Sequence, residues 1–340
     1  MGVNPALWGF KKLTTKTWPV SGANVAASPG TINFDLKDFL PTEILSRLML
    51  RVVGPVIIAG SGAGAATGRE NPEALIQSIN GQTSPSVGMI SRSNLTTRGL
   101  IQLGIFDRGY SIHGTPIADA AATVQVDFTM PLNYKQPGSV NPIEWALPMK
   151  LFTGYNFAIQ VGGREQLFSG GTNTFDVSGL KLEVWAEFET GVAGAFHAIE
   201  HFESIIPVLA TQTDLPLNLD PGFFYTHLLF IAERDNVKDD TLINSISVQG
   251  GGRIWTPQGD GNAPMLERFT RESHVYNAAE SLTGTYFVAA LRDGMYTRAI
   301  DALTDKVQVK FDVTLGGGTQ RQIRVIGRRI KPLALKVASA

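Results

Sequence analysis

Two histidines four positions apart are the first candidates for chemistry. His197 and His201 have Glu200 between them, and Glu203 follows closely. On a helix, residues four apart share one face, and imidazole with carboxylate is a ligand set that can hold Zn²⁺. The order differs from the HExxH pattern of zinc hydrolases, because Glu200 directly precedes the second histidine. We therefore expect a surface or interface pair and no bound metal.

A glycine-rich run follows an apolar stretch at Val56–Gly64. Such a run can bring a pyrophosphate close to backbone N–H groups at the start of a helix. The surroundings argue against a nucleotide site, because Pro55 lies in the supposed strand, and Gly68 and Pro72 interrupt the helix that should follow. We expect a flexible, exposed loop between strands.

The remaining reactive side chains form no catalytic pattern. The chain has no cysteine, which excludes thiolate catalysis, disulfides and Cys-ligated zinc. No serine lies in a GxSxG turn, and there is no Walker loop. We predict no enzymatic activity and no cofactor. A carbohydrate-active or carbohydrate-binding β-sandwich stays open as an alternative, because the spacing of two carboxylates in space is not visible in a sequence.

Both ends of the chain combine residues typical of a contact surface. Aromatic rings that sit at the headgroups beside cations that meet anionic lipid are suited to a membrane interface. The C-terminal part concentrates positive charge in one strand-like segment, at Arg321, Arg324, Arg328, Arg329, Lys331 and Lys336. The candidates for contact with a membrane or with neighbouring subunits on the inner side of a shell are Trp8, Phe10, Lys11, Lys12, Lys16, Arg328 and Arg329. The alternative is a solvated basic strand and a disordered arm.

Composition places the chain among globular proteins. Of its 340 residues, 43% are hydrophobic and 17% are charged, and 36 Gly and 18 Pro favour many turns. This length suggests two domains. The formal net charge of −1 gives no overall field that would attract nucleic acid, so we expect no specific nucleic-acid binding. The start lacks the pattern of a secretory signal, and the most apolar stretch, 52–66, is too short to span a bilayer.

The elements that position these residues are expected to be mainly strands. Apolar and polar residues alternate from Leu180 to Phe188 and again from Val307 to Leu315, which is the period of a strand with one buried face. Further strands are expected at 31–36, 48–53, 124–130, 155–161, 225–232 and 286–291. Short helices are expected at 41–47, 72–77, 196–204 and 264–271. Many short strands separated by turns indicate a sandwich or a barrel.

The sequence contains an internal repeat. Leu75–Gln82 matches Leu242–Gln249, and each segment follows a charged turn. Further on, each of the two alternating segments is followed by an apolar run with a proline, at Ile205–Ala210 and Ile330–Leu335. These matches predict two halves in tandem.

The halves extend over about 30–210 and 212–336, and the first is longer in its middle. A rival register, which matches Val124–Phe128 to Val309–Val313, stays open because alternating strands resemble one another by composition alone. A pair of unrelated β domains is the other alternative.

A tandem of two β-sandwiches of this size resembles the double jelly-roll major capsid proteins of tailless icosahedral bacteriophages with an internal membrane, the tectivirus and corticovirus-like group. The resemblance covers about residues 30–336 and rests on the duplicated layout and the strand order. It implies an all-β fold of two tandem eight-stranded jelly rolls with a few short helices. The first jelly roll would extend over 30–210 and the second over 211–340, after an N-terminal arm at 1–29.

The resemblance also implies a structural role, that of a major capsid protein. The subunit would assemble in the host cytoplasm as a pseudo-hexagonal homotrimer and reside in the shell of the virion. Its partners would be further copies of itself, other virion proteins such as a vertex penton, and an internal lipid membrane, with both chain ends on the inner side of the shell. A phage tail or spike component is a further alternative, since it would share the β content but form a fibre or a tube.

Overall fold

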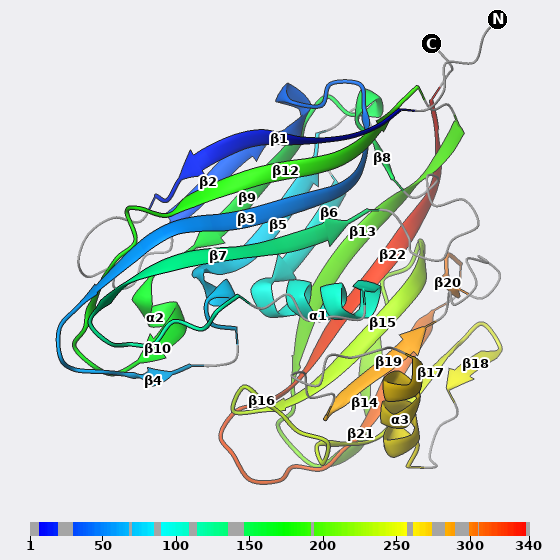
Figure 1. Cartoon of the computed structure of the whole chain (residues 1–340). Coiled ribbons are helices and arrows are strands. Elements are labelled where there is room, and N and C mark those ends of the chain that lie inside the picture. Colours follow the sequence, from blue (N-terminus) through cyan, green and yellow to red (C-terminus); the bar gives the residue numbers. More distant parts are fainter. Residues whose placement is uncertain are drawn as a thin grey trace, which may run out of the picture.

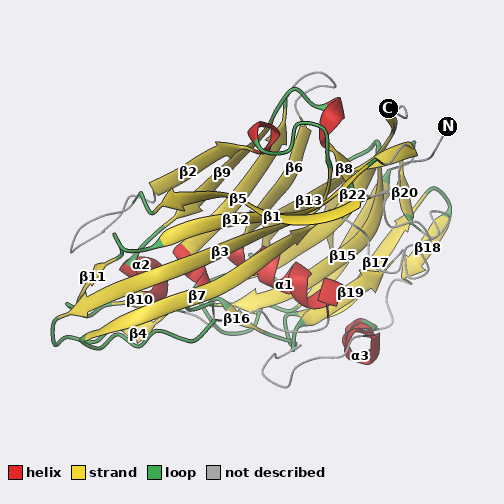
Figure 2. Cartoon of the chain, turned by 45° about the horizontal axis from the view of Figure 1, so that its top comes forward, coloured by secondary structure: helices red, strands yellow, loops and turns green. Residues whose placement is uncertain are grey.

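The computed structural model shows a chain built almost wholly from strands, arranged as two β-sandwiches that adjoin (Figure 1). It describes residues 7–19, 30–67, 70–84, 90–108, 114–134, 146–191, 194–256, 261–273, 283–289, 299–304 and 306–337. Figure 2 shows that helices are few beside the strands. Within the described ranges, no helix is both long enough and apolar enough to cross a membrane.

One sheet belongs to the first sandwich alone. Its antiparallel strands lie in the order β1 (Leu7–Thr17), β12 (Lys181–Thr190), β3 (Ile44–Ala59) and β7 (Ala122–Asn133). The short strands β8 (Leu147–Pro148) and β11 (Thr174–Asp176) also pair with β3. The inward side chains of β12 are buried because their alternation with polar residues matches the pleat of the strand.

A longer sheet runs through both sandwiches. Its main order is β2 (Gly30–Asp35), β9 (Tyr155–Val161), β5 (Ile76–Thr83), β6 (Ile90–Thr96), β13 (Gly194–Pro207), β22 (Arg321–Val337) and β15 (Phe223–Arg234). The strands β16 (Val237–Lys238), β19 (Thr285–Ala289) and β20 (Ile300–Ala302) pair with β15. The second sandwich is closed by a sheet of β14 (Gln212–Asn218), β21 (Val307–Val313), β17 (Ile243–Gly250) and β18 (Arg253–Thr256). A small ribbon pairs β4 (Ala65–Ala66) with β10 (Phe168–Ser169).

Both sandwiches have the same topology. Eight strands build each one: β1, β2, β3, β5, β6, β7, β9 and β12 in the first, and β13, β14, β15, β17, β18, β19, β21 and β22 in the second. Counted in chain order within each set, the strands lie as first-eighth-third-sixth in one sheet and second-seventh-fourth-fifth in the other. This is the arrangement of a jelly roll. The chain is therefore an all-β double jelly roll, as the resemblance implied.

Strand pairing divides the chain differently from the expected boundaries. Residues 7–17, which were expected in an arm, form the first strand of the first jelly roll through their pairing with β12. Residues 194–207, which were expected at the end of the first half, form the first strand of the second jelly roll through their pairing with β22. Each jelly roll therefore begins one strand earlier than the sequence suggested.

The internal repeat was half correct. Leu75–Gln82 and Leu242–Gln249 cover the fourth strands, β5 and β17, so this match joins equivalent strands. The other match is wrong, because Leu180–Phe188 falls mostly on the eighth strand β12 and Val307–Leu315 mostly on the seventh strand β21. Any strand with one buried face alternates, so the pattern alone does not distinguish neighbouring strands.

The helices occupy corresponding places in the two jelly rolls. Helix α1 (Thr97–Arg108) and helix α3 (Ala263–Ser273) each follow the fifth strand and precede the sixth, while α2 (Arg164–Leu167) is a single turn. Short 3₁₀ turns are η1 (Leu36–Asp38), η2 (Glu73–Leu75) and η4 (Met149–Leu151). The helix expected at 264–271 is confirmed, and α1 was missed.

Two expected helices are strands, and a third is much shorter than expected. Most of 41–47 belongs to β3, and 196–204 belongs to β13, because both segments pair with neighbouring strands along their length. Within 72–77, only Glu73–Leu75 is helical, and strand β5 begins at Ile76.

The main hydrophobic core joins the two jelly rolls. Leu229 and Ile326, on the outer face of the second jelly roll's sheet, are 2% and 0% exposed and belong to the same buried cluster as Leu100 and Leu103 of α1. Helix α1 therefore lies between the two jelly rolls, and its apolar side chains are closed to water where the two meet.

Candidate assembly interface

The N-terminal candidates lie on strand β1, at the edge of the first jelly roll. Trp8 and Phe10 are 65% and 47% exposed on the outer face of the sheet. The Phe10 ring stacks on Trp185 of β12 with 5.3 Å between centroids, and Trp8 Nε1 donates a hydrogen bond of 3.1 Å to Glu187. Pairing between β1 and β12 thus brings together aromatic residues that are far apart in sequence.

The same face carries a row of ion pairs across four strands. Lys12 of β1 lies 3.1 Å from Glu183 of β12, Glu183 lies 3.2 Å from Arg51 of β3, and Arg51 lies 2.6 Å from Asp127 of β7. The hydrogen bond from Lys12 lowers the pKa of Glu183, and the one from Arg51 lowers the pKa of Asp127. The Arg51 and Asp127 side chains are 37% and 55% exposed, so we call this row the open ladder.

These contacts change the expectation for the lysines. Lys12 is paired with a carboxylate, and Lys11 donates a 3.0 Å hydrogen bond to the carbonyl of Phe39. Lys16 is partly exposed on the same strand. The surface combines aromatic rings with balanced charges instead of a net positive patch, and aromatic residues and arginine are enriched at protein interfaces.

The C-terminal candidates lie elsewhere. Arg328 is 1% exposed, and its Nε donates a 3.3 Å hydrogen bond to His201. Arg329 pairs with Glu200 at 3.0 Å, and its guanidinium lies 3.9 Å from the centre of the Phe223 ring. The expectation that Arg328 offers its charge to a membrane or to an inner shell surface is therefore not supported, because its side chain is buried and the neighbouring Arg329 is paired with a carboxylate.

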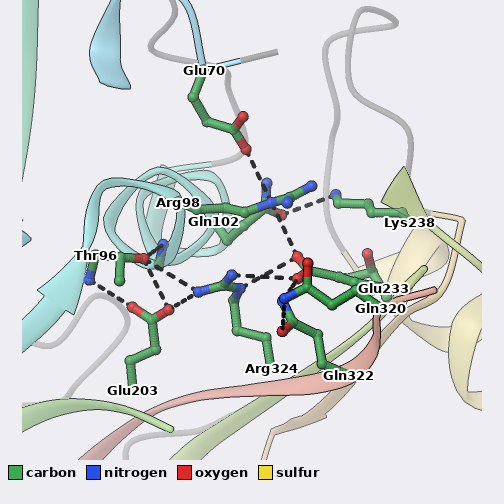
Figure 3. Close-up of polar contacts among 12 residues, drawn as sticks. Glu70, Thr96, Arg98, Gln102, Glu203, Glu233, Lys238, Gln320, Gln322 and Arg324 are labelled. Carbon is green, nitrogen blue, oxygen red and sulfur yellow. Dashed lines mark hydrogen bonds and ion pairs between the residues drawn. The ribbon is translucent and has the colours of Figure 1, made fainter. Parts of the chain in front are cut away.

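A second row of ion pairs lies under α1, and sequence reasoning missed it (Figure 3). Arg324 of β22 lies 3.3 Å from Glu233 of β15 and forms a short ion pair with Glu203 of β13. The side chains of Arg324, Glu203 and Glu233 are 8%, 5% and 0% exposed. Burial by itself would lower the pKa of Arg324, but the two carboxylates raise it above its usual value. We call this row the covered ladder.

Helix α1 contributes further contacts to the covered ladder. Arg98 Nε lies 3.1 Å from Glu233 and 3.0 Å from Glu70. The backbone N–H of Thr96 donates a 2.6 Å hydrogen bond to Glu203, where α1 begins. The sequence did carry a signal, because Arg324 stands between Ile323 and Val325 in a strand-like segment, and a charge in such a place requires a partner.

The other sequence candidates show no reactive site. Among the described residues, no group of three or more His, Asp or Glu side chains is placed to hold a metal. In the glycine run, the N–H of Gly64 donates a 2.6 Å hydrogen bond to Asp119, which also lies 2.8 Å from Arg164. A carboxylate therefore occupies the place where a phosphate would bind, which opposes the nucleotide interpretation. The expected loop is partly exposed, but its glycines pack against residues 169–173.

Comparisons by sequence find no relative, since no protein-family model and no curated protein matches the chain. Solved structures do match. The major capsid protein of Sulfolobus turreted icosahedral virus superposes with a TM-score of 0.66 at 11% identity, over 96% of this chain and 97% of that chain. The major capsid protein of bacteriophage PM2 gives a TM-score of 0.57 at 13% identity, over 97% of this chain and 100% of that chain. The Faustovirus major capsid protein gives a TM-score of 0.58 at 8% identity, over 98% of this chain and 91% of that chain.

These matches cover both jelly rolls in one alignment. At such low identity, they show the fold and leave the function to be argued. The resemblance to double jelly-roll capsid proteins is therefore confirmed as a fold. The matching proteins come from viruses of several kinds, so they do not single out the internal-membrane bacteriophages.

Proposed function

We propose that this protein is a major capsid protein of an icosahedral virus, that it is located in the shell of the virion, and that its role is structural and not enzymatic. The observation that carries the proposal is the pair of equivalent jelly rolls joined through one continuous sheet. Solved structures that share this arrangement over nearly the whole chain are major capsid proteins. We further propose a homotrimer, because three chains then supply six similar blocks around one axis.

The positions of the two chain ends support an orientation in the shell. Leu7 pairs with Thr190, and Val337 pairs with Gly194, so β1 begins and β22 ends at the same end of the molecule (Figure 1). The glycine run after Ala59 lies at the opposite end of the sheet. We propose that the end with Leu7 and Val337 faces the inside, toward an internal membrane or neighbouring capsomers, and that vertex proteins such as a penton are further partners.

The test of the proposal is the mass of the purified protein in solution. Light scattering combined with size exclusion should give about three times 36.7 kDa, and negative-stain images should show six-lobed particles. A stable monomer at micromolar concentration would contradict the trimer.

One observation bears on the carbohydrate alternative. A cavity of about 330 Å³ beside α3 is lined by Asp240, Glu267 and Tyr286, with Pro264 and Arg268. Two acids and one aromatic ring are the side chains that a glycan site would use. A monomer that binds or hydrolyses glycans, and loses this property in Glu267→Gln, would favour the alternative over the capsid role.

A further inference from the structure

The two jelly rolls of one chain meet through two contacts. The first is between strand edges, where the fifth strand of the first jelly roll, β6, pairs in parallel with the first strand of the second, β13. The second is between a helix and a sheet, where α1, which follows β6, covers the outer face of β13, β22 and β15. Together they form what we call the internal junction.

Each of the two strand edges in the internal junction has an equivalent elsewhere in the chain, and among the described strands that equivalent edge has no pairing partner. Within the described strands, the fifth strand of the second jelly roll, β18, pairs with β17 alone, and the first strand of the first jelly roll, β1, pairs with β12 alone. Figure 1 shows β1 at the upper edge of the molecule and β18 at the lower right. Two complementary edges on different sides of one chain are what a head-to-tail ring requires.

The helix that corresponds to α1 is also uncovered on one side. Helix α3 packs on its own jelly roll through Ala263, which is 1% exposed, but Met265 is 53% exposed. Pro264 and Arg268 are exposed as well. In contrast, Leu100, Ile101, Leu103 and Ile105 of α1 are at most 5% exposed, because α1 has a sheet on both sides.

The two ladders lie on equivalent strands. The covered ladder joins Glu203, Arg324 and Glu233 on the first, eighth and third strands of the second jelly roll. The open ladder joins Lys12, Glu183 and Arg51 on the same three strands of the first. The charges of the two ladders have opposite signs. Arg98 of α1 pairs with Glu233 in the covered ladder, but on the open ladder it would face Arg51 and be repelled. A helix other than α1 is therefore favoured over the open ladder.

We propose that the contact between subunits repeats the internal junction: β18 of one chain pairs in parallel with β1 of a second copy, and α3 covers the Trp8–Phe10–Trp185 face and its open ladder. This inference rests on the proposed function and names the surfaces that would join its subunits. Eight large hydrophobic side chains are exposed among the described residues, and four of them, Trp8, Phe10, Ile254 and Met265, lie on these surfaces. The exposed cation Arg268 would approach a face that carries the carboxylate of Asp127.

The absence of native cysteine allows a direct test by cross-linking. The double variant Phe10→Cys/Ile254→Cys is treated with a short bis-maleimide at the concentration where the native protein is oligomeric. We expect covalent dimers and trimers. The control Leu209→Cys/Ile254→Cys should stay monomeric on a denaturing gel, because Leu209, although 84% exposed, lies outside the proposed contact.

A second pair of variants measures the helix contact. Met265→Glu should weaken the trimer at least tenfold in sedimentation, while Leu209→Glu should leave it unchanged. If native trimers form but neither the cross-link nor the effect of Met265→Glu is observed, the inference fails and the proposed capsid role stands. If the native protein is a monomer, the inference and the proposed trimeric capsid subunit both fail.

Discussion

Replacing Glu233 with glutamine should destabilise the chain strongly, because this carboxylate is 0% exposed and serves two arginines. Arg324 lies 3.3 Å from it and Arg98 lies 3.1 Å from it. Breaking a buried ion pair by removing one partner costs about 3–5 kcal/mol. In the variant, Arg324 still forms its ion pair with Glu203, and Arg98 still forms its ion pair with Glu70. We therefore expect a loss at the lower end of this range, about 3 kcal/mol. For a chain of 340 residues, that loss lowers the melting temperature by about 4 °C.

The assay is urea unfolding followed by tryptophan fluorescence, with all variants at one protein concentration. The matched control is Asp127→Asn, which removes the carboxylate of the open ladder that is 55% exposed and pairs with Arg51, itself 37% exposed. Exposed ion pairs contribute less than about 1 kcal/mol, so this variant should be nearly neutral in the monomer. Equal and small losses in both variants would refute the argument that cover by α1 makes the difference.

Three further outcomes are expected. The pKa values of Glu183 and Asp127 are lowered in the folded chain by their hydrogen bonds to Lys12 and Arg51. The open ladder should therefore contribute its full free energy of unfolding above about pH 5, and this contribution should be lost as the pH falls through the lowered pKa values. A series of urea unfolding curves that shows no loss of stability in acid would contradict the expectation. Trp18→Ala should cost about 3–5 kcal/mol in the same unfolding assay, since Trp18, directly after β1, is 4% exposed and donates to the carbonyl of Gly162; a neutral effect would mean that the segment after β1 does not pack on the first jelly roll. Ile326→Ala should lower stability by about 2–5 kcal/mol within a single transition, and separate transitions by fluorescence and circular dichroism would show that the two jelly rolls do not share a core.

The strands and one helix could be predicted because their signals are local. The alternation through Leu182 and Val184 has the period of the pleat, and the segment at 264–271 has an amphipathic pattern. Helix α1 was missed because its buried apolar residues Leu100, Ile101, Leu103 and Ile105 are not confined to one face and because it contains Gly99 and Gly104. A helix placed between two sheets needs no polar face, so it lacks the periodicity that marks a surface helix.

The candidate surface was predicted in only part of its residues, and not in its chemistry. Trp8, Phe10 and Lys12 do share one exposed face. Their partners Glu183 and Trp185 are more than 170 positions away, and strand pairing alone brings them together. Charges that are neighbours in sequence, Arg328 and Arg329, separate because adjacent residues of a strand point to opposite faces.

By itself, the amino-acid sequence determined that the protein is all-β, that it contains a repeat, and that the N-terminal aromatic residues form part of an exposed surface, because periods of two and local composition are properties of short segments. The tertiary structure alone decided which strands are equivalent, where each jelly roll begins, and why one ladder is covered and the other open. These depend on pairings between distant strands, whose free energy comes from partners that no local pattern identifies. The reversed signs of Glu233 and Arg51 acquire a meaning only once both are seen on the third strand of their sandwiches.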